Sequence, residues 1–238
     1  MNLSTLTHPD HTLHEIEAHL YSSFSGDSPG GSYDRIARFY DTVVGSKLYN
    51  QLLWGTATSN YQGFARRALK NCTGPLLDIG SGTAVFTAKT YARADQPIIL
   101  VDRSLEMLKE ASHRIQRSQV TGSMEDIALV QADLFDLPFQ EECFSAILAM
   151  GMFHLFKNGP KFIDALLSPL KDGGKLYFSS LVTDRFVGRQ YLSLLHRSNV
   201  VAHPRTFKEV NRIVKEVAGN SEIKAWREGN MAYFILDK

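Results

Sequence analysis

Short, continuous runs of apolar residues alternate with amphipathic stretches through the middle of the chain. The apolar runs predict five strands, at Leu76–Ile79, Pro97–Asp102, Ile127–Gln131, Phe144–Met150 and Lys175–Val182. The stretches between them predict helices near residues 83–93, 104–117 and 160–170. A strand that is apolar throughout is buried on both faces, which is typical of a parallel sheet covered by helices. The pattern therefore predicts a doubly wound α/β fold.

The end of the chain departs from this alternation. Arg205–Ala218 predicts a helix that ends at Gly219-Asn220. Ser221–Glu228 and Met231–Asp237 predict two strands joined by Gly229-Asn230. A connection this short holds no crossover helix, so the two strands must be antiparallel. We therefore expect a Rossmann-like sheet of seven strands, mostly parallel with the last strand antiparallel, and helices on both faces.

The chain before the first predicted strand has a different character. Residues 1–32 are interpreted as a flexible N-terminal arm, because residues 25–32 are rich in glycine and small polar residues. Within this arm, His11–Tyr21 predicts a short amphipathic helix. Residues 33–238 then form the main domain, which opens with a helical cap at 33–74 built from stretches near 33–44, 46–54 and 57–71. Residues 183–204, rich in aromatic and basic residues, are interpreted as an insertion.

Composition narrows the classes of function. The 238 residues are 44% hydrophobic and 21% charged, as in ordinary globular proteins. The net charge of +1 lacks the basic excess of a protein that grips nucleic acid. No apolar run approaches the ~20 residues of a membrane helix, and the N-terminus lacks a signal-peptide pattern. We expect a cytoplasmic protein with no nucleic-acid or membrane partner, in which Cys72 and Cys143 are free thiols.

The early histidines raise the question of a metal site. His8, His11 and His14 recur every three residues, and His14-Glu15 is followed by His19. This misses the zinc motif H-E-x-x-H by one residue, so a five-residue step would place the second histidine off the shared helical face. We expect a solvated segment and no metal.

The strongest chemical signal lies where the first predicted strand enters the turn of LLDIGSGTA, residues 76–84. The glycines of such a turn allow a sharp bend and close approach of a ligand, and a following helix would offer free N–H groups. Asp102 ends the next strand, 20 residues after Gly82, which is the spacing that brings a carboxylate to ribose hydroxyls. The alternatives are a plain strand–helix turn and an aspartate that caps the next helix.

Two further positions carry weaker signals. Asp133 ends the third strand and is followed by Leu134, a pair suited to the amino group and the face of an adenine. The alternative for Asp133 is ordinary turn chemistry. His154 follows the fourth strand and is interpreted either as a packed, hydrogen-bonded histidine or as a general base.

Taken in order, several segments resemble the class I S-adenosylmethionine-dependent methyltransferases of the small-molecule type, which includes ubiquinone/menaquinone-biosynthesis methyltransferases. These segments are LLDIGSGTA, IILVDRSLEML, VQADLFDLPF, FSAILAMGMFHLF, SPLKDGGKLYFSS and the closing strand pair. The resemblance covers residues 33–238 and includes YDRIARFYD at residues 33–41, which resembles a helix that often precedes this fold. It implies S-adenosylmethionine as cofactor and a small molecule as methyl acceptor.

The resemblance also implies roles for individual positions. The positions that would lie against the methionine part of the cofactor are Asp78, Gly80, Ser81 and Gly82. Asp102 would bind the ribose, and the positions around the adenine are Arg103, Asp133 and Leu134. Met150 and Gly151 would line the floor under the sulfonium. Ala84 stands where many members have a third glycine, and Ser145 where an acid is common. Tyr33 and Tyr40, which share a helical face, are catalytic candidates beside His154; the alternative for both is a place in the core.

The expected reaction is methyl transfer by in-line displacement at a sulfonium carbon. Since such a donor is already activated, the protein mainly supplies alignment and exclusion of water, and no catalytic triad is required. One alternative is a non-catalytic S-adenosylmethionine-binding protein on the same fold. Another is an NAD(P)-dependent oxidoreductase, which Asp133 and the antiparallel closing pair disfavour. The sequence leaves open the acceptor, its reacting atom, the pathway and the oligomeric state.

Overall fold

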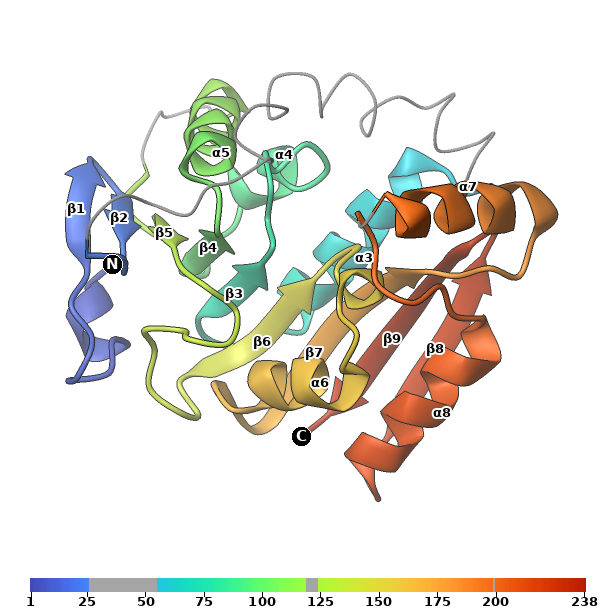
Figure 1. Cartoon of the computed structure of the whole chain (residues 1–238). Helices are drawn as coiled ribbons and strands as arrows, with labels where there is room; N and C mark the ends of the chain where they lie inside the picture. The colour runs from blue at the N-terminus through green and yellow to red at the C-terminus, as the bar shows by residue number, and fades with distance from the viewer. Residues whose placement is uncertain (26–54, 119–123, 199) are drawn as a thin grey trace.

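A computed structural model describes residues 1–25, 55–118, 124–198 and 200–238, and nine strands in these ranges form one sheet (Figure 1). The strands are β1 (His14–Glu17), β2 (Leu20–Ser22), β3 (Leu76–Ile79), β4 (Ile98–Asp102), β5 (Ile127–Gln131), β6 (Phe144–Ala149), β7 (Leu170–Leu181), β8 (Ile223–Glu228) and β9 (Met231–Asp237). The helices are η1 (Leu3–Thr5), α3 (Thr58–Lys70), α4 (Ala88–Tyr91), α5 (Leu105–Ser118), η3 (Phe153–Leu155), α6 (Gly159–Leu167), α7 (Phe186–Arg197) and α8 (Phe207–Ala218).

The strand order is β1-β2-β5-β4-β3-β6-β7-β9-β8. Strands β5, β4, β3, β6 and β7 are parallel, whereas β9 pairs antiparallel with both β7 and β8. The α/β class, the parallel centre and the antiparallel closing pair are therefore as predicted. Because the parallel strands end at one edge of the sheet, that edge is where their loops and α7 gather (Figure 1).

The first 25 residues require a correction. Strand β2 pairs parallel with β5, with Leu20 opposite Leu129, and β1 pairs antiparallel with β2. The helix predicted over His11–Tyr21 is therefore wrong, and the described sheet has nine strands where seven were expected. The physical reason is burial: Leu20 is 1% exposed against the main sheet, whereas every residue of β1 is exposed. An apolar pattern this short does not separate a helix from a strand.

The predicted N-terminal cap is described only in part. Its stretches near 33–44 and 46–54 lie outside the described residues, and its stretch near 57–71 is α3. The boundaries between an arm at 1–32 and a domain at 33–238 stay predictions. Among the described residues, no helix is both long and apolar enough to cross a membrane.

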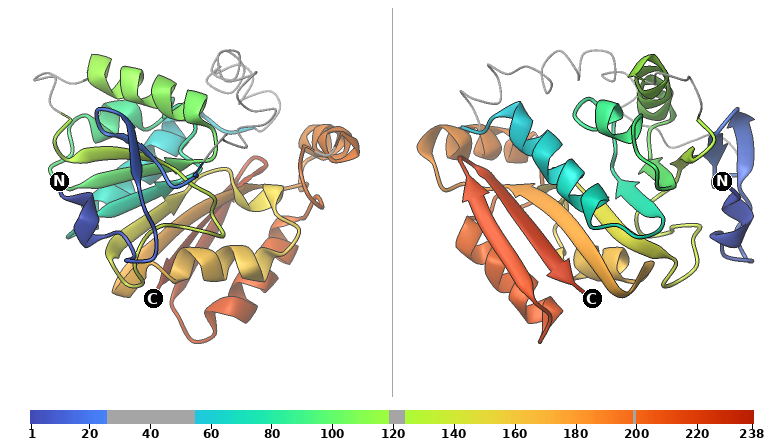
Figure 2. Two further views of the ribbon diagram at one scale, coloured as in Figure 1. Left: turned by 60° about the vertical axis from the view of Figure 1, so that its left-hand side comes forward. Right: turned by 180° about the vertical axis from the view of Figure 1, so that it is seen from behind.

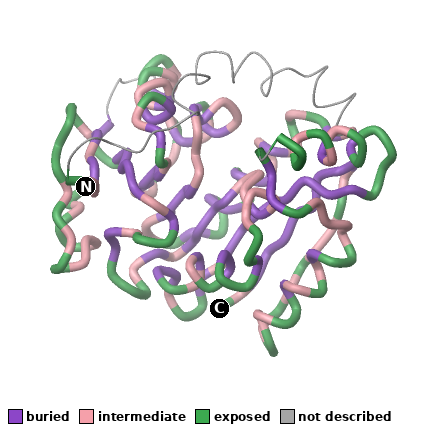
Figure 3. The backbone as a smooth tube through the Cα atoms, viewed as in Figure 1, coloured by how far each residue is buried: buried purple, intermediate pink, exposed green. Residues whose placement is uncertain are grey.

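Both faces of the sheet are buried, which accounts for the continuous apolar strands (Figure 3). Along β4, Ile98 and Leu100 pack on the face that α3, α4 and α5 cover, whereas Ile99 and Val101 pack on the face covered by α6 and α8. Neighbouring side chains of a strand point to opposite faces, so a doubly covered sheet requires an apolar residue at every position. The view turned by 60° shows α5 on one side of the sheet and α6 and α8 on the other (Figure 2, left).

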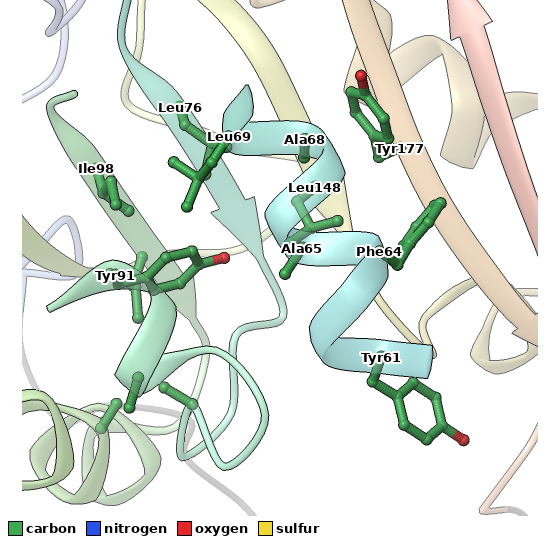
Figure 4. Packing of buried hydrophobic residues seen from close by; sticks show 14 of the residues in the cluster. Tyr61, Phe64, Ala65, Ala68, Leu69, Leu76, Tyr91, Ile98, Leu148 and Tyr177 are labelled. Carbon is green, nitrogen blue, oxygen red and sulfur yellow. The ribbon is translucent and has the colours of Figure 1, made fainter. Parts of the chain in front are cut away.

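Helix α3 shows how a helix is fixed to this sheet (Figure 4). Its buried residues recur at helical spacing, so one stripe faces the sheet, formed by Tyr61, Phe64, Ala65, Ala68 and Leu69. The ring of Phe64 lies edge-on to Tyr177 with the centroids 5.7 Å apart. Burial of one such ring contributes about 1.5–3 kcal/mol. The opposite face carries exposed Arg66 and Arg67.

Candidate functional site

The turn after β3 holds two glycines with different neighbours. Gly80 and Gly82 have φ values of +66° and +53°, which side-chain-bearing residues adopt only with strain. A Cβ on Gly80 would lie 2.1 Å from the sulfur of Met152, whereas a Cβ on Gly82 would meet no described residue within 4 Å. Packing therefore requires the first glycine, and the second borders open space at the carboxyl edge of the sheet.

The segment after this turn corrects the predicted helix at 83–93. Helix α4 begins only at Ala88, because Ala84 has a φ of +53° and a left-handed residue cannot belong to a right-handed helix. No helix N-terminus therefore stands directly behind the glycines. The carbonyl of Thr83 instead accepts a 3.0 Å hydrogen bond from Nε of Arg114 on α5.

Asp102 links the turn to the next helix. Its Oδ2 accepts a hydrogen bond of 2.9 Å from the N–H of Gly82, and its Oδ1 accepts one of 3.0 Å from the N–H of Ser104. Ser104 in turn accepts from the N–H of Met107 in the first turn of α5. The capping alternative for Asp102 is thus present, and the same carboxylate also lies beside the open glycine.

Asp78 lies underneath the turn and is 2% exposed. Tyr91 of α4 donates a 2.7 Å hydrogen bond to its Oδ2. Burial, with a further contribution from the negative charge of Asp102, raises the pKa of Asp78 to about 7, although the bond from Tyr91 acts in the opposite direction. Asp78 is therefore a buried link between β3 and α4, and its partner Tyr91 was not among the residues predicted from the sequence.

The structure brings Arg103 and Asp133 together at the ends of β4 and β5. The guanidinium Nε of Arg103 lies 3.3 Å from Oδ2 of Asp133, whose Oδ1 accepts from the N–H of Phe135. Behind them, buried Gln131 donates to the carbonyl of Arg103 and accepts from Oγ of Ser22 on β2. No sequence pattern indicated Gln131, because its role depends on the unforeseen β2 strand. Leu134, the other predicted adenine contact, is 7% exposed.

Gly151 forms a second open turn, at the end of β6. Its φ is +64°, its N–H donates a 2.8 Å bond to Oγ of Ser179, and a Cβ there would meet none of the described residues within 4 Å. Strands β3 and β6 are neighbours, so Gly82 and Gly151 follow adjacent strand ends, with partly buried Met150 beside the second. Buried Ser179, which fixes this turn, was missed because a serine inside an apolar strand carries no distinguishing pattern.

The three catalytic candidates differ in what the structure says of them. Nδ1 of His154 accepts a 3.3 Å bond from the N–H of Leu181, and burial lowers the pKa of His154 to about 4, so the ring is neutral at pH 7. His154 is thus hydrogen-bonded to Leu181, as one of its two interpretations expected, and a role of His154 as a general base stays a prediction. Tyr33 and Tyr40 lie outside the described residues. Within the described part of the chain, no cluster of histidine, cysteine, aspartate and glutamate could hold a metal ion.

A different polar cluster lies around the turn between β8 and β9. Asn230 is 1% exposed, and its Oδ1 accepts a 2.7 Å bond from the N–H of Arg185, the residue that precedes α7. On α3, Asn60 donates to the carboxylate of Glu228 and to Oγ1 of Thr56. These contacts are made by side chains, in contrast to the main-chain turn over β3.

The comparisons with known proteins agree with this geometry. Residues 77–178 match the family described as a methyltransferase domain. A ubiquinone/menaquinone biosynthesis C-methyltransferase of Wigglesworthia glossinidia brevipalpis is 30% identical over 111 residues, 44% of this chain and 43% of that protein. Over residues 77–178 this chain is similar to the methyltransferase domain of that family. It spans less than two thirds of the length of the curated relatives that it matches, among which identity is about 30%.

Two solved structures show how far this methyltransferase fold extends along the chain. An S-adenosylmethionine-dependent methyltransferase from Thermotoga maritima has a TM-score of 0.60 at 16% identity and covers 87% of this chain and 97% of its own. Phosphoethanolamine N-methyltransferase 2 of Haemonchus contortus, solved with phosphomonomethylethanolamine and S-adenosylhomocysteine, has a TM-score of 0.62 at 15% identity. It covers 86% of this chain and 57% of its own. At these identities the likeness concerns the fold.

The residues at the carboxyl edge fit the cofactor of this family, S-adenosylmethionine. Gly82 and Gly151 both border space that a Cβ would enter without contact, as a cradle for a ligand requires. The buried Oγ of Ser81, between the two glycines of the first turn, has no hydrogen-bond partner among the described residues. A buried polar atom without a partner is unfavourable by about 1–3 kcal/mol, and a polar ligand at this turn would satisfy it.

Proposed function

We propose that this chain is an enzyme that transfers a methyl group from S-adenosylmethionine to a small-molecule acceptor. The observation that carries the proposal is the pair of open glycine turns, at Gly82 and Gly151, flanked by the carboxylate of Asp102. Bound at this edge, the cofactor supplies a methyl group on a positively charged sulfur. A nucleophilic atom of the acceptor forms a bond to that methyl carbon as the carbon–sulfur bond breaks, and S-adenosylhomocysteine leaves.

The residues of the chain bind and align in this proposal. Asp102, fixed by the N–H groups of Gly82 and Ser104, accepts hydrogen bonds from the ribose. Arg103 and Asp133, held together as an ion pair, flank the adenine with Leu134. The Ser81 hydroxyl, which has no hydrogen-bond partner among the described residues, is the group of this turn that we assign to the methionine part. Since the donor needs no activation, this preorganised binding accounts for the reaction when the acceptor is nucleophilic on its own.

The acceptor class to test first is a quinol ring carbon. The support for it is the name of the Wigglesworthia relative, a C-methyltransferase of ubiquinone and menaquinone biosynthesis, and the matched part of that relative is 43% of its length. An ionised quinol has a nucleophilic ring carbon, so it needs no strong base from the protein. This agrees with a His154 that is neutral and holds a main-chain N–H.

Two measurements test the proposal in sequence. Calorimetric titration of the full chain should show that S-adenosylmethionine and S-adenosylhomocysteine bind, and that NAD and NADP do not. Transfer of a radiolabelled methyl group is then measured with a panel of quinols, amines and phenols. Binding without transfer to any acceptor would favour the non-catalytic alternative, and preferential binding of a nicotinamide cofactor would overturn the proposal.

A further inference from the structure

Helix α7 has apolar residues on two opposite faces. Gly188 and Leu192 are buried against the rest of the domain. On the other side Phe186, Val187 and Leu194 are 72%, 51% and 57% exposed. At 100° per residue these three positions fall within an arc of about 100°, so they share one side of the helix. An ordinary surface helix has one apolar stripe and a polar outer face.

The charge of this segment is one-sided. Residues 185–208 contain five lysines and arginines and no aspartate or glutamate. Arg185, Arg189 and Arg197 are exposed, and no ion pair joins them to an acid within the part of the chain that the structure describes. The preceding Asp184 is engaged elsewhere, with Arg227 and with the N–H of Phe207.

We infer that α7 is a docking surface for an anionic lipid bilayer, on which the helix lies in the interface with Phe186, Val187 and Leu194 inserted among the headgroups. A helix that combines an exposed apolar face with neighbouring arginines binds such surfaces through burial of apolar area and through attraction to acidic lipids. The inference concerns a surface contact, so it requires no membrane-spanning helix. It does not rest on the proposed methyl transfer.

Two features of α7 distinguish this partner from others. The phosphate backbone of a nucleic acid would engage the arginines but would gain nothing from exposed valine and leucine side chains. A second copy of the chain would place two arginine-rich faces against each other, which is unfavourable. In the structure α7 lies at the rim of the molecule, at the carboxyl edge of the sheet (Figure 2), and its apolar side chains Phe186, Val187 and Leu194 are exposed.

The anchoring of α7 is also suited to a surface element. Asn230 binds both the N–H and the carbonyl of Arg185, at 2.7 and 3.5 Å, and thereby fixes the start of the helix. A Cβ on Gly188 would collide with the same amide, so the helix sits close against the β8–β9 turn. The exposed apolar side chains are thus held in place on a structured element, and burying them requires no refolding.

The test is flotation of the full chain with vesicles of phosphatidylcholine alone and of equal parts phosphatidylcholine and phosphatidylglycerol. We expect binding to the mixed vesicles only, weakened by salt. Arg197→Gln should reduce the affinity about fivefold, and Phe186→Ser should reduce it about tenfold or more. The matched controls are Arg66→Gln on α3 and Ile16→Ser on β1, exposed residues of the same kinds elsewhere, which should bind as the parent does.

The outcomes that would overturn the inference are distinct. The inference is wrong if the parent chain binds neither kind of vesicle, or if it binds both kinds equally. It is also wrong if Phe186→Ser binds the mixed vesicles as tightly as the parent does. Binding of duplex DNA, or self-association in solution, that Phe186→Ser abolishes would assign the face to those partners instead. Melting temperatures and S-adenosylhomocysteine affinities equal to the parent's show that each variant is folded, and they separate a failure here from a failure of the proposed function.

Discussion

The two halves of the carboxyl edge are built by different means. Over β3, β4 and β6 the chain uses glycine turns and main-chain groups, held by Asp102 and Ser179. Over β7, β9 and β8 it uses side chains, and a single buried amide, that of Asn230, holds the start of α7. Main-chain groups move only with the backbone, whereas a side-chain contact changes with one substitution. The first half is therefore suited to an invariable ligand, and the second can vary with the acceptor or surface it meets.

The largest effect on cofactor binding is expected from Gly82→Val, in the half of the edge over β3, β4 and β6. A valine at a φ of +53° is strained and places its methyl groups in the open space of the turn. We expect S-adenosylmethionine affinity to fall at least about a hundredfold, or roughly 2.7 kcal/mol, by calorimetry. The control is Gly173→Val, whose φ is +73° and whose Cβ also meets nothing. If both variants bind the cofactor as the parent does, the turn is only structural.

Asp102→Ala should weaken cofactor binding about a hundredfold, because charge-assisted hydrogen bonds to two ribose hydroxyls are lost. The substitution also removes the acceptor for the N–H groups of Gly82 and Ser104, so melting temperature is measured in parallel. Ser104→Ala is the matched control, since it removes the hydroxyl that accepts from the N–H of Met107 in α5 and leaves the Asp102 carboxylate in place. Equal affinity losses in the two variants would show that Asp102 acts through the fold alone.

Asp78, in the half of the edge over β3, β4 and β6, should make the stability of the protein depend on pH. Its pKa is raised to about 7 in the folded protein from an ordinary value of 3.8, so between these values the folded state holds a proton that the unfolded chain releases. Stability should therefore fall as the pH rises from about 4 to about 7, by at most a few kcal/mol. Urea unfolding across this range should show a smaller decline for Asp78→Asn than for the parent or for the exposed control Asp172→Asn. Parallel declines in all three would contradict the assignment.

The smallest of these effects concerns the second half. Asn230→Ala leaves the N–H of Arg185 without its acceptor and should lower the free energy of unfolding by about 2 kcal/mol. Cofactor affinity should be unchanged, because the contact lies beyond β7. Asn158→Ala, which removes the exposed cap of α6, should lose about 1 kcal/mol. A drop in cofactor affinity for Asn230→Ala would show that the two halves are coupled.

The sequence predicted the parts of the fold that local pattern controls. Leu76–Ile79 and Ile127–Gln131 are strands with the predicted limits, because a doubly buried strand is apolar at every position. Gly82 and Asp102, which were selected by their spacing, lie within hydrogen-bond distance of each other, and their roles in cofactor binding stay predictions. By contrast, the pairing of Leu20 with Leu129 depends on chain segments more than a hundred positions apart, which no local pattern encodes.

In the candidate site, too, only the residues that belong to a local motif could be predicted. The glycines and acids lie at strand ends, where a motif specifies them. Tyr91, Gln131 and Ser179 support those residues from other elements, and their side chains have many other uses, so their types alone indicate nothing. Ala84 shows that prediction also fails within the motif. Its left-handed backbone keeps the expected helix from starting there, and this conformation follows from the path of the chain and not from the preference of alanine.

The strand pair at the beginning of the chain has a consequence for biosynthesis. Residue 20 is made 109 residues before residue 129, the partner it needs in β5. At a synthesis rate of about 5–20 residues per second, β2 waits roughly 5–20 seconds before its place in the sheet exists. During that interval the apolar Leu20 and Tyr21 are without the strand that later covers them. Strand β2 can therefore join the sheet only after the later β5 has been made, and the exposed Glu15 and Glu17 of β1 disfavour pairing of this edge with other strands in the meantime.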